Sequence, residues 1–139
     1  MMKTQPLHLC FQGEEMAFKV IMPAIRSYLK LMPLEQAGLV EVAISEAVAN
    51  ALKASEGKFV NINLSVNSKG SLLVRIRDRG KGFDVETALA RLAAWEQEIP
   101  EEALYAESGR GLWVIHQVFD KVQYNQPGNE LLMVKCLSS

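Results

Sequence analysis

The hydrophobic period of the chain changes near residue 57, and this change limits the folds that it can form. Residues 33–55 carry apolar side chains at helical spacing, with Pro33 in the first turn. The stripe consists of Val40, Ile44, Ala47, Val48 and Ala51. Residues 58–66 instead alternate, as a half-buried strand does, and Val60, Ile62 and Leu64 share one side. The turn 67–70 and the apolar residues of 71–78 add a hairpin partner.

The segments before this helix predict a strand and another helix. Residues 6–12 alternate and indicate a short strand, and residues 14–31 carry apolar side chains at helical spacing. Pro23 conflicts with this helix, because proline removes one backbone hydrogen bond and either kinks a helix or starts a new one.

The segments after the hairpin predict a short helix and a loop within 84–108, a helix over 111–121 and a closing hairpin from 122–125 and 131–137. This order favours an α+β fold. We expect a two-layer sandwich with a mixed, mainly antiparallel sheet and helices on one face.

Composition bounds the function. The 139 residues suit one domain, 1–139, of which 49% are hydrophobic and 22% charged. A net charge of −1 gives no reason to expect nucleic acid or a membrane surface as a partner. No apolar run reaches the roughly 18 residues of a membrane helix, and we expect a cytoplasmic protein. Cys10 and Cys136 are expected to be small buried side chains rather than a disulfide or metal ligands.

One polar pair stands out on the second helix. Glu46 and Asn50 are one helical turn apart, on a different flank from the apolar stripe. A carboxylate can accept a proton from an attacking hydroxyl. An amide oxygen can bind Mg²⁺, which prefers oxygen ligands. A solvated helix flank is the alternative, although asparagine is a poor residue for the middle of a helix.

Two glycine motifs follow. DRGKGFD (78–84) comes directly after a strand, and its glycines, Gly80 and Gly82, permit positive φ and close approach of a ligand. Asp78 can accept a hydrogen bond from an exocyclic amine such as that of adenine. A tight turn with exposed charges is the alternative interpretation.

The second motif is ESGRGLWVI (107–115), with Gly109 and Gly111 at a predicted helix start. Free amides at a helix start suit phosphate oxygens, and Arg110 adds a positive charge. A helix capped by Ser108 is the alternative. The motif matches neither the P-loop nor the Rossmann pattern.

Taken in order, ExxxN on a helix, DxGxGF after a strand and SGRGL opening a helix resemble the three nucleotide boxes of the GHKL ATPase superfamily. With SEAVANALK and SGRGLWVI in one short domain, the chain is most similar to bacterial anti-sigma factor serine kinases. The resemblance covers residues 7–137 and implies the Bergerat sandwich. It also implies ATP and Mg²⁺ as cofactors, with residues 84–108 as a lid over ATP.

The resemblance assigns roles by position. Glu46 would be the general base and Asn50 the Mg²⁺ ligand, while Asp78 would contact the adenine amine. The remaining nucleotide-binding positions are Gly80, Gly82 and Phe83 around the base and Gly109, Arg110, Gly111 and Leu112 along the phosphates.

The implied function is an ATP-dependent serine protein kinase that binds a sigma factor and phosphorylates an antagonist of the STAS type. A homodimer is also expected, with Phe11, Phe18, Ile21, Met22 and Ile25 as a surface for it, and the alternative is that these residues are simply the core. The alternative is a non-catalytic module that binds ATP or ADP. Glu130 and the segment ALKASE (51–56) favour it, because a carboxylate near the phosphates would repel them. A detached domain of a histidine kinase is disfavoured.

Overall fold

The computed structural model describes residues 5–94 and 107–137, and for 107–110 it describes the backbone alone. Its elements, in chain order, are β1 (Leu7–Gln12), α1 (Glu15–Leu29), α2 (Ala37–Ala54), β2 (Phe59–Val66), β3 (Ser71–Arg77), α3 (Val85–Ala94), α5 (Glu107–Val118), β4 (Lys121–Tyr124) and β5 (Glu130–Cys136). None of the described helices combines the length and apolar character that a membrane span requires.

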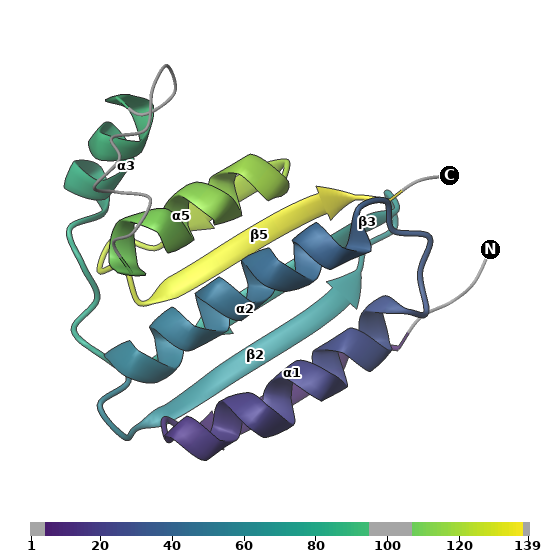
Figure 1. Cartoon of the computed structure of the whole chain (residues 1–139), viewed down its shortest axis with the longest axis horizontal. Helices are drawn as coiled ribbons and strands as arrows, with labels where there is room; N and C mark the ends of the chain where they lie inside the picture. The colour runs from purple at the N-terminus through teal and green to yellow at the C-terminus, as the bar shows by residue number, and fades with distance from the viewer. Residues whose placement is uncertain (1–4, 95–106, 138–139) are drawn as a thin grey trace.

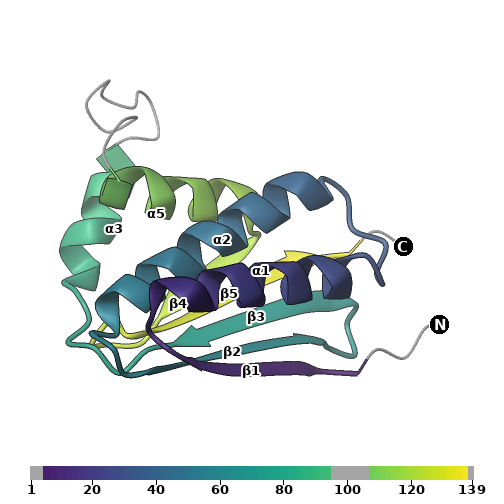
Figure 2. The ribbon, with the colours of Figure 1, turned by 60° about the horizontal axis from the view of Figure 1, so that its bottom comes forward.

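The strands form one sheet with the order β1-β2-β3-β5-β4, and each described pairing is antiparallel. Helices α1, α2 and α5 lie side by side on one face of this sheet (Figures 1 and 2). The two-layer α+β sandwich expected from the sequence is therefore confirmed. Both views place α3 at the end of the sheet where β3 ends and β5 begins.

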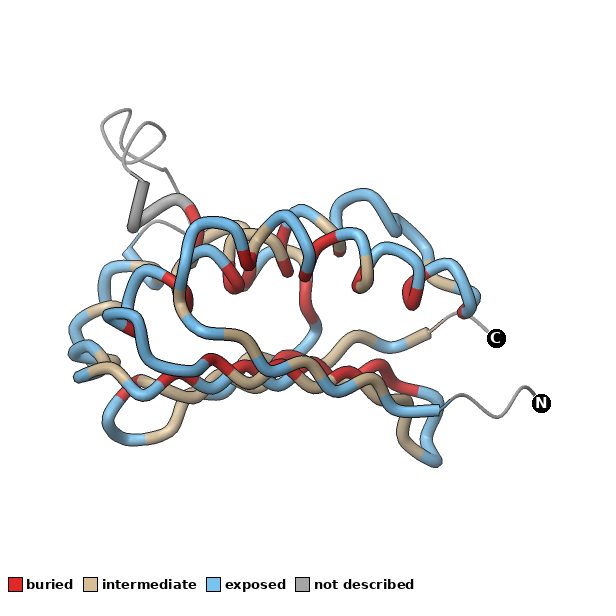
Figure 3. Tube along the Cα trace, turned by 90° about the horizontal axis from the view of Figure 1, so that it is seen from below, coloured by how far each residue is buried: buried red, intermediate tan, exposed pale blue. Residues whose placement is uncertain are grey.

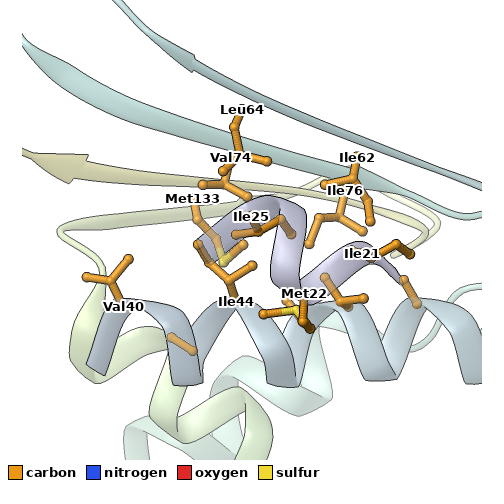
Figure 4. Packing of buried hydrophobic residues seen from close by; sticks show 14 of the residues in the cluster. Ile21, Met22, Ile25, Val40, Ile44, Ile62, Leu64, Val74, Ile76 and Met133 are labelled. Atoms are coloured by element: carbon orange, nitrogen blue, oxygen red, sulfur yellow. The ribbon is translucent and has the colours of Figure 1, made fainter. Parts of the chain in front are cut away.

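The core lies between the two layers, and buried residues occur on their facing sides (Figure 3). The alternating strand residues Val60, Ile62 and Leu64 are fully buried, as the sequence predicted. They face an apolar stripe on α2, whose predicted members Val40, Ile44, Ala47, Val48 and Ala51 are all buried. Figure 4 shows labelled residues of α1, α2, β2, β3 and β5 meeting in this cluster.

Pro33 does not lie where the sequence suggested, and of the two alternatives for Pro23 the start of a new helix is excluded. Helix α1 continues from Glu15 to Leu29 through the exposed Pro23, so no new helix starts there. Helix α2 begins at Ala37, which contradicts the placement of Pro33 in its first turn. Gln36 has a left-handed backbone (φ 56°), so the helical conformation cannot extend back to Pro33.

Three other expectations need correction. Both cysteines are exposed rather than buried, because Cys10 and Cys136 fall on the sheet face opposite the described helices. The suggested dimer surface is also wrong in part, since Ile21, Met22 and Ile25 belong to the core. Helix α5 spans Glu107–Val118, several residues before the predicted 111–121.

Candidate functional site

A cavity of about 400 Å³ opens beside the inner face of the sheet, a volume typical of small-molecule sites. Its walls come from α2, the loop after β3, α3, α5 and the β4–β5 hairpin. The predicted site residues that line it are Asn50, Asp78, Gly82, Phe83 and Leu112. Segments that are far apart in the sequence therefore meet at one cavity, as the nucleotide hypothesis requires.

Glu46 and Asn50 lie one turn apart on α2, both half-buried, and α5 packs against them. A Cβ atom at Gly111 would lie 3.0 Å from Glu46 Oε2 and 3.4 Å from Asn50 Nδ2. Glycine at 111 thus lets α5 approach the polar pair closely. Asn50 lines the cavity, whereas Glu46 lies beside it, next to Gly111.

The second glycine motif lies inside α5 rather than ahead of it. Because the helix begins at Glu107, Ser108 cannot be the residue that precedes it. Gly109 falls in the first turn of the described helix, and Gly111 falls in its second turn. The side chains of residues 107–110 lie outside the described part of the chain, so the role of Arg110 stays a prediction.

Asp78 follows β3 and is buried, with only 8% of its surface exposed. Its Oδ1 accepts a hydrogen bond from the Gly80 N–H at 2.7 Å. Burial raises the pKa of the Asp78 carboxyl, and the Gly80 hydrogen bond partly opposes this rise. The loop thus holds a buried acceptor at a fixed place in the cavity wall.

The two glycines of this loop are required for different reasons. A Cβ atom at Gly80 would lie 2.1 Å from the Ala54 carbonyl oxygen, at the end of α2. Gly82 has a φ of +77°, and a Cβ atom there would lie 1.7 Å from the Pro127 carbonyl oxygen. Close packing requires the first glycine, while both packing and backbone conformation require the second.

The β4–β5 turn holds this loop in place, which sequence reasoning missed. Asn125 Oδ1 accepts hydrogen bonds from three successive amides, those of Gly128, Asn129 and Glu130, at 2.9–3.0 Å. The turn then bonds to the loop. Its contacts are Phe83 N–H to the Pro127 oxygen, Asp78 N–H to the Asn129 oxygen, and Asn129 Nδ2 to the Gly80 oxygen. The sequence Asn-Gln-Pro-Gly at 125–128, which is typical of a turn, was the signal from which this contact could have been sought.

Glu130 lines the cavity, but its carboxylate pairs with Arg75, whose Nε lies 3.6 Å from Glu130 Oε1. Glu130 is paired with Arg77 in the sheet, so it shares the outer face with Arg75 and Arg77. This orientation weakens the argument that its charge repels a phosphate. In the segment 51–56, Ala51 and Ala54 line the cavity, while Ser55 is buried and bonds to the Leu52 oxygen.

Helix α3 lines the cavity through Thr87 and Arg91, among others. Asp84 anchors the helix start, because its carboxylate accepts hydrogen bonds from the N–H and hydroxyl of Thr87. These bonds lower the pKa of Asp84. Among the described residues that line the cavity, Arg91 is the cationic one. Residues 95–106 of the predicted lid lie outside the described residues.

Comparison with known proteins identifies the fold family. Residues 15–135 match the histidine kinase-like ATPase domain. The chain belongs to this family. It is also 31% identical over 98 residues to the serine-protein kinase RsbW of Oceanobacillus iheyensis. That match covers 68% of this chain and 61% of the relative, so the chain spans less than two thirds of it. The resemblance to the GHKL superfamily and its anti-sigma factor kinases is confirmed.

Asn50 lines the cavity, and its amide oxygen is of the kind that Mg²⁺ binds. In the described part of the chain no group of three His, Cys, Asp or Glu side chains is placed to hold a metal. Mg²⁺ typically binds through one or two protein oxygens and substrate phosphates. Asn50 at the cavity wall would supply one such oxygen.

Proposed function

We propose that this chain is an ATP- and Mg²⁺-dependent serine protein kinase that acts as an anti-sigma factor. The observation that carries the proposal is that Asn50 on α2 and Asp78 after β3 line the same cavity. The similarity to a serine-protein kinase supports the choice of reaction. All ten predicted site residues keep their proposed roles in it.

The base end of the site would be the loop 78–84. Adenine offers an exocyclic amine, and Asp78 offers a buried carboxylate that the Gly80 amide already orients. Gly80, Gly82 and Phe83 would shape the pocket around the base. A base that lacks a donor at this position would leave the buried carboxylate without a partner, which is costly.

The phosphate end would lie between α2 and α5. Mg²⁺ would neutralise phosphate charge, and Asn50 would bind it through its amide oxygen. The amide of Gly109, with Arg110, Gly111 and Leu112, would line the phosphates at the helix start. Arg91 on α3 adds a positive charge from the lid side of the cavity.

Glu46 would act on the protein substrate. As the serine oxygen bonds to the γ-phosphorus and the bond to the leaving ADP oxygen breaks, the Glu46 carboxylate would accept the hydroxyl proton. Most of the rate enhancement in such a transfer comes from positioning and charge neutralisation. Its place beside Gly111 puts this carboxylate next to the helix that would bind the phosphates.

The proposed partners are a sigma factor and a STAS-type antagonist whose serine is phosphorylated, and the active form is a homodimer. Phosphorylation of the antagonist would decide which partner the kinase holds.

A second candidate function is a binding module that holds ATP or ADP without phosphoryl transfer. One observation favours it, namely that Glu46 does not itself line the cavity. The two candidates agree on nucleotide binding and differ in what Glu46 does.

A transfer assay separates them. The chain would be mixed with STAS-type antagonists from the same genome and γ-labelled ATP, with Glu46→Gln as the test variant. We expect label on an antagonist serine with the wild type, and at least a hundredfold slower labelling with Glu46→Gln at unchanged ATP affinity, at the lower end of about 10²–10⁴ for acid–base catalysis. Tight ATP binding without any labelled antagonist would favour the binding module.

A further inference from the structure

Three rings from separate segments of the chain form a contiguous cluster at one side of the cavity. Phe83 belongs to the loop after β3, Tyr124 ends β4, and His116 lies on α5. The Phe83 and Tyr124 ring centroids are 5.4 Å apart with planes at 89°, an edge-to-face contact. The Tyr124 and His116 rings are stacked at 5.8 Å and 25°. Phe83 and Tyr124 line the cavity, and His116 lies behind them.

A hydrogen bond joins Tyr124 and His116. The Tyr124 hydroxyl oxygen lies 3.0 Å from His116 Nε2. Burial lowers the pKa of His116 and raises that of Tyr124, so both side chains are neutral near pH 7. A neutral imidazole with its proton on Nδ1 accepts a hydrogen bond from the tyrosine hydroxyl at Nε2. Tyr124 therefore has both its ring and its hydroxyl held by α5.

The Phe83 ring depends on Tyr124 for its orientation. Phe83 keeps 39% of its surface exposed, and its backbone is fixed by the bond to the Pro127 oxygen. Its ring lies over Gly128, where a Cβ atom would come within 2.9 Å of Phe83 Cδ1. Gly128 on one side and Tyr124 on another thus confine the ring at the cavity wall.

The cluster stands across the cavity floor from Asp78. Ile76, Leu131 and Tyr124 are side by side in the sheet register, and all three line the cavity. Asp78 follows Ile76 by two residues and lines the same cavity. Since neighbouring strands are about 4.8 Å apart, β3 and β4 bound a floor about 10 Å wide. A purine that is hydrogen-bonded to Asp78 would then face the rings of Phe83 and Tyr124 on the opposite side of the cavity.

We propose that His116 and Tyr124 are positioning residues that hold Phe83 as a wall of the nucleobase pocket and connect this pocket to helix α5. The proposal rests on the proposed function, because it assumes that the cavity binds a nucleotide. It adds two residues outside the three sequence boxes. It also gives the base pocket and the phosphate-binding helix a shared structural link.

The test is ATP affinity, measured by calorimetry on the full chain. Tyr124→Phe removes the hydrogen bond and should weaken ATP binding about threefold, whereas His116→Ala also removes the stacked ring and should weaken it at least as much. The double variant should bind ATP no more weakly than His116→Ala alone. His116→Gln, whose amide reaches the position of Nε2, should restore wild-type affinity. Tyr124→Ala removes the support of Phe83 and should weaken ATP binding about tenfold, as should Phe83→Ala.

Phe59→Ala is the matched control, because Phe59 is 48% exposed on β2, lies outside the cavity and should leave affinity unchanged. Thermal unfolding of each variant checks that it is folded. Wild-type affinity in both Tyr124→Phe and His116→Ala, or fully additive losses in the double variant, would overturn the proposal. Failure of the wild type to bind ATP would instead refute the proposed function.

Discussion

The two glycine motifs have similar sequences but different structural roles. In the first, at 78–84, the glycines are set by contacts with α2 and with the β4–β5 turn. In the second, Gly109 and Gly111 lie within α5, and the described contact of Gly111 is with the Glu46–Asn50 pair. The first motif is therefore part of the rigid wall of the cavity, whereas the second sets how closely a helix approaches the proposed catalytic pair. Substitutions in the two should have different consequences.

The largest effect is expected for Gly82→Ala. An alanine at φ +77° is strained, and its Cβ atom would collide with the Pro127 carbonyl oxygen at 1.7 Å. We expect a loss of about 3 kcal/mol or more in the free energy of unfolding, together with loss of ATP binding. Urea unfolding measures the first, with Gly70→Ala as control. Gly70 also has positive φ, at +77°, but no neighbour within 4 Å, so equal losses in both variants would show that the clash is irrelevant.

Asn125→Ala should have the next largest effect. The substitution removes the acceptor of three turn amides and releases the turn that holds loop 78–84. We expect a loss of about 2 kcal/mol in the free energy of unfolding and weaker ATP binding. The matched control is Asn67→Ala, because Asn67 Oδ1 accepts hydrogen bonds from two backbone amides in the β2–β3 turn, away from the cavity. It should lose stability without losing ATP affinity, and equal effects on affinity would contradict the account.

Gly111→Ala should change stability little and activity more. Alanine favours a helix by about 1 kcal/mol over glycine, which offsets the tight contact at 3.0 Å with the flexible Glu46 carboxylate. We expect a stability change within about 1 kcal/mol but phosphoryl transfer about tenfold slower, because Glu46 is displaced. Combining it with Glu46→Gln should give no further loss of rate. A stability loss as large as that of Gly82→Ala would remove the distinction between the motifs.

The smallest effect concerns Asp78 and pH. Burial raises its pKa in the folded state, so the folded protein holds the proton more tightly than the unfolded chain does. The stability of the wild type relative to Asp78→Asn should therefore fall as pH rises through this pKa, and level off above it. Urea unfolding of both proteins between pH 4 and pH 7 measures the difference. A relative stability that rises with pH would mean that the bond from Gly80 outweighs burial.

The sequence predicted the features that depend on local periodicity. The alternation of Val60, Ile62 and Leu64 and the helical stripe of α2 are buried as expected, since one element's spacing determines which side faces the core. The cavity residues Asn50 and Asp78 were also found, because their motifs are short and ordered along the chain.

The features that depend on distant contacts could not be predicted. The start of α2 is set by a left-handed Gln36, a conformation for which glutamine gives no signal. The hydrogen bonds that Asn125 accepts, and the orientation of Glu130 toward the outer sheet face, depend on the pairing of β3, β4 and β5. The exposure of Cys10 depends on which sheet face the helices leave uncovered. The positions of Asn125, Glu130 and Cys10 thus follow from tertiary pairing, which a single sequence does not specify.

The most direct test of the central claim is calorimetry of ATP binding, with and without Mg²⁺, on the wild type and on Asn50→Ala. The account predicts that the wild type binds ATP, that Mg²⁺ strengthens the binding, and that Asn50→Ala abolishes this strengthening while leaving the protein folded. Absence of ATP binding by the folded wild type would contradict the account.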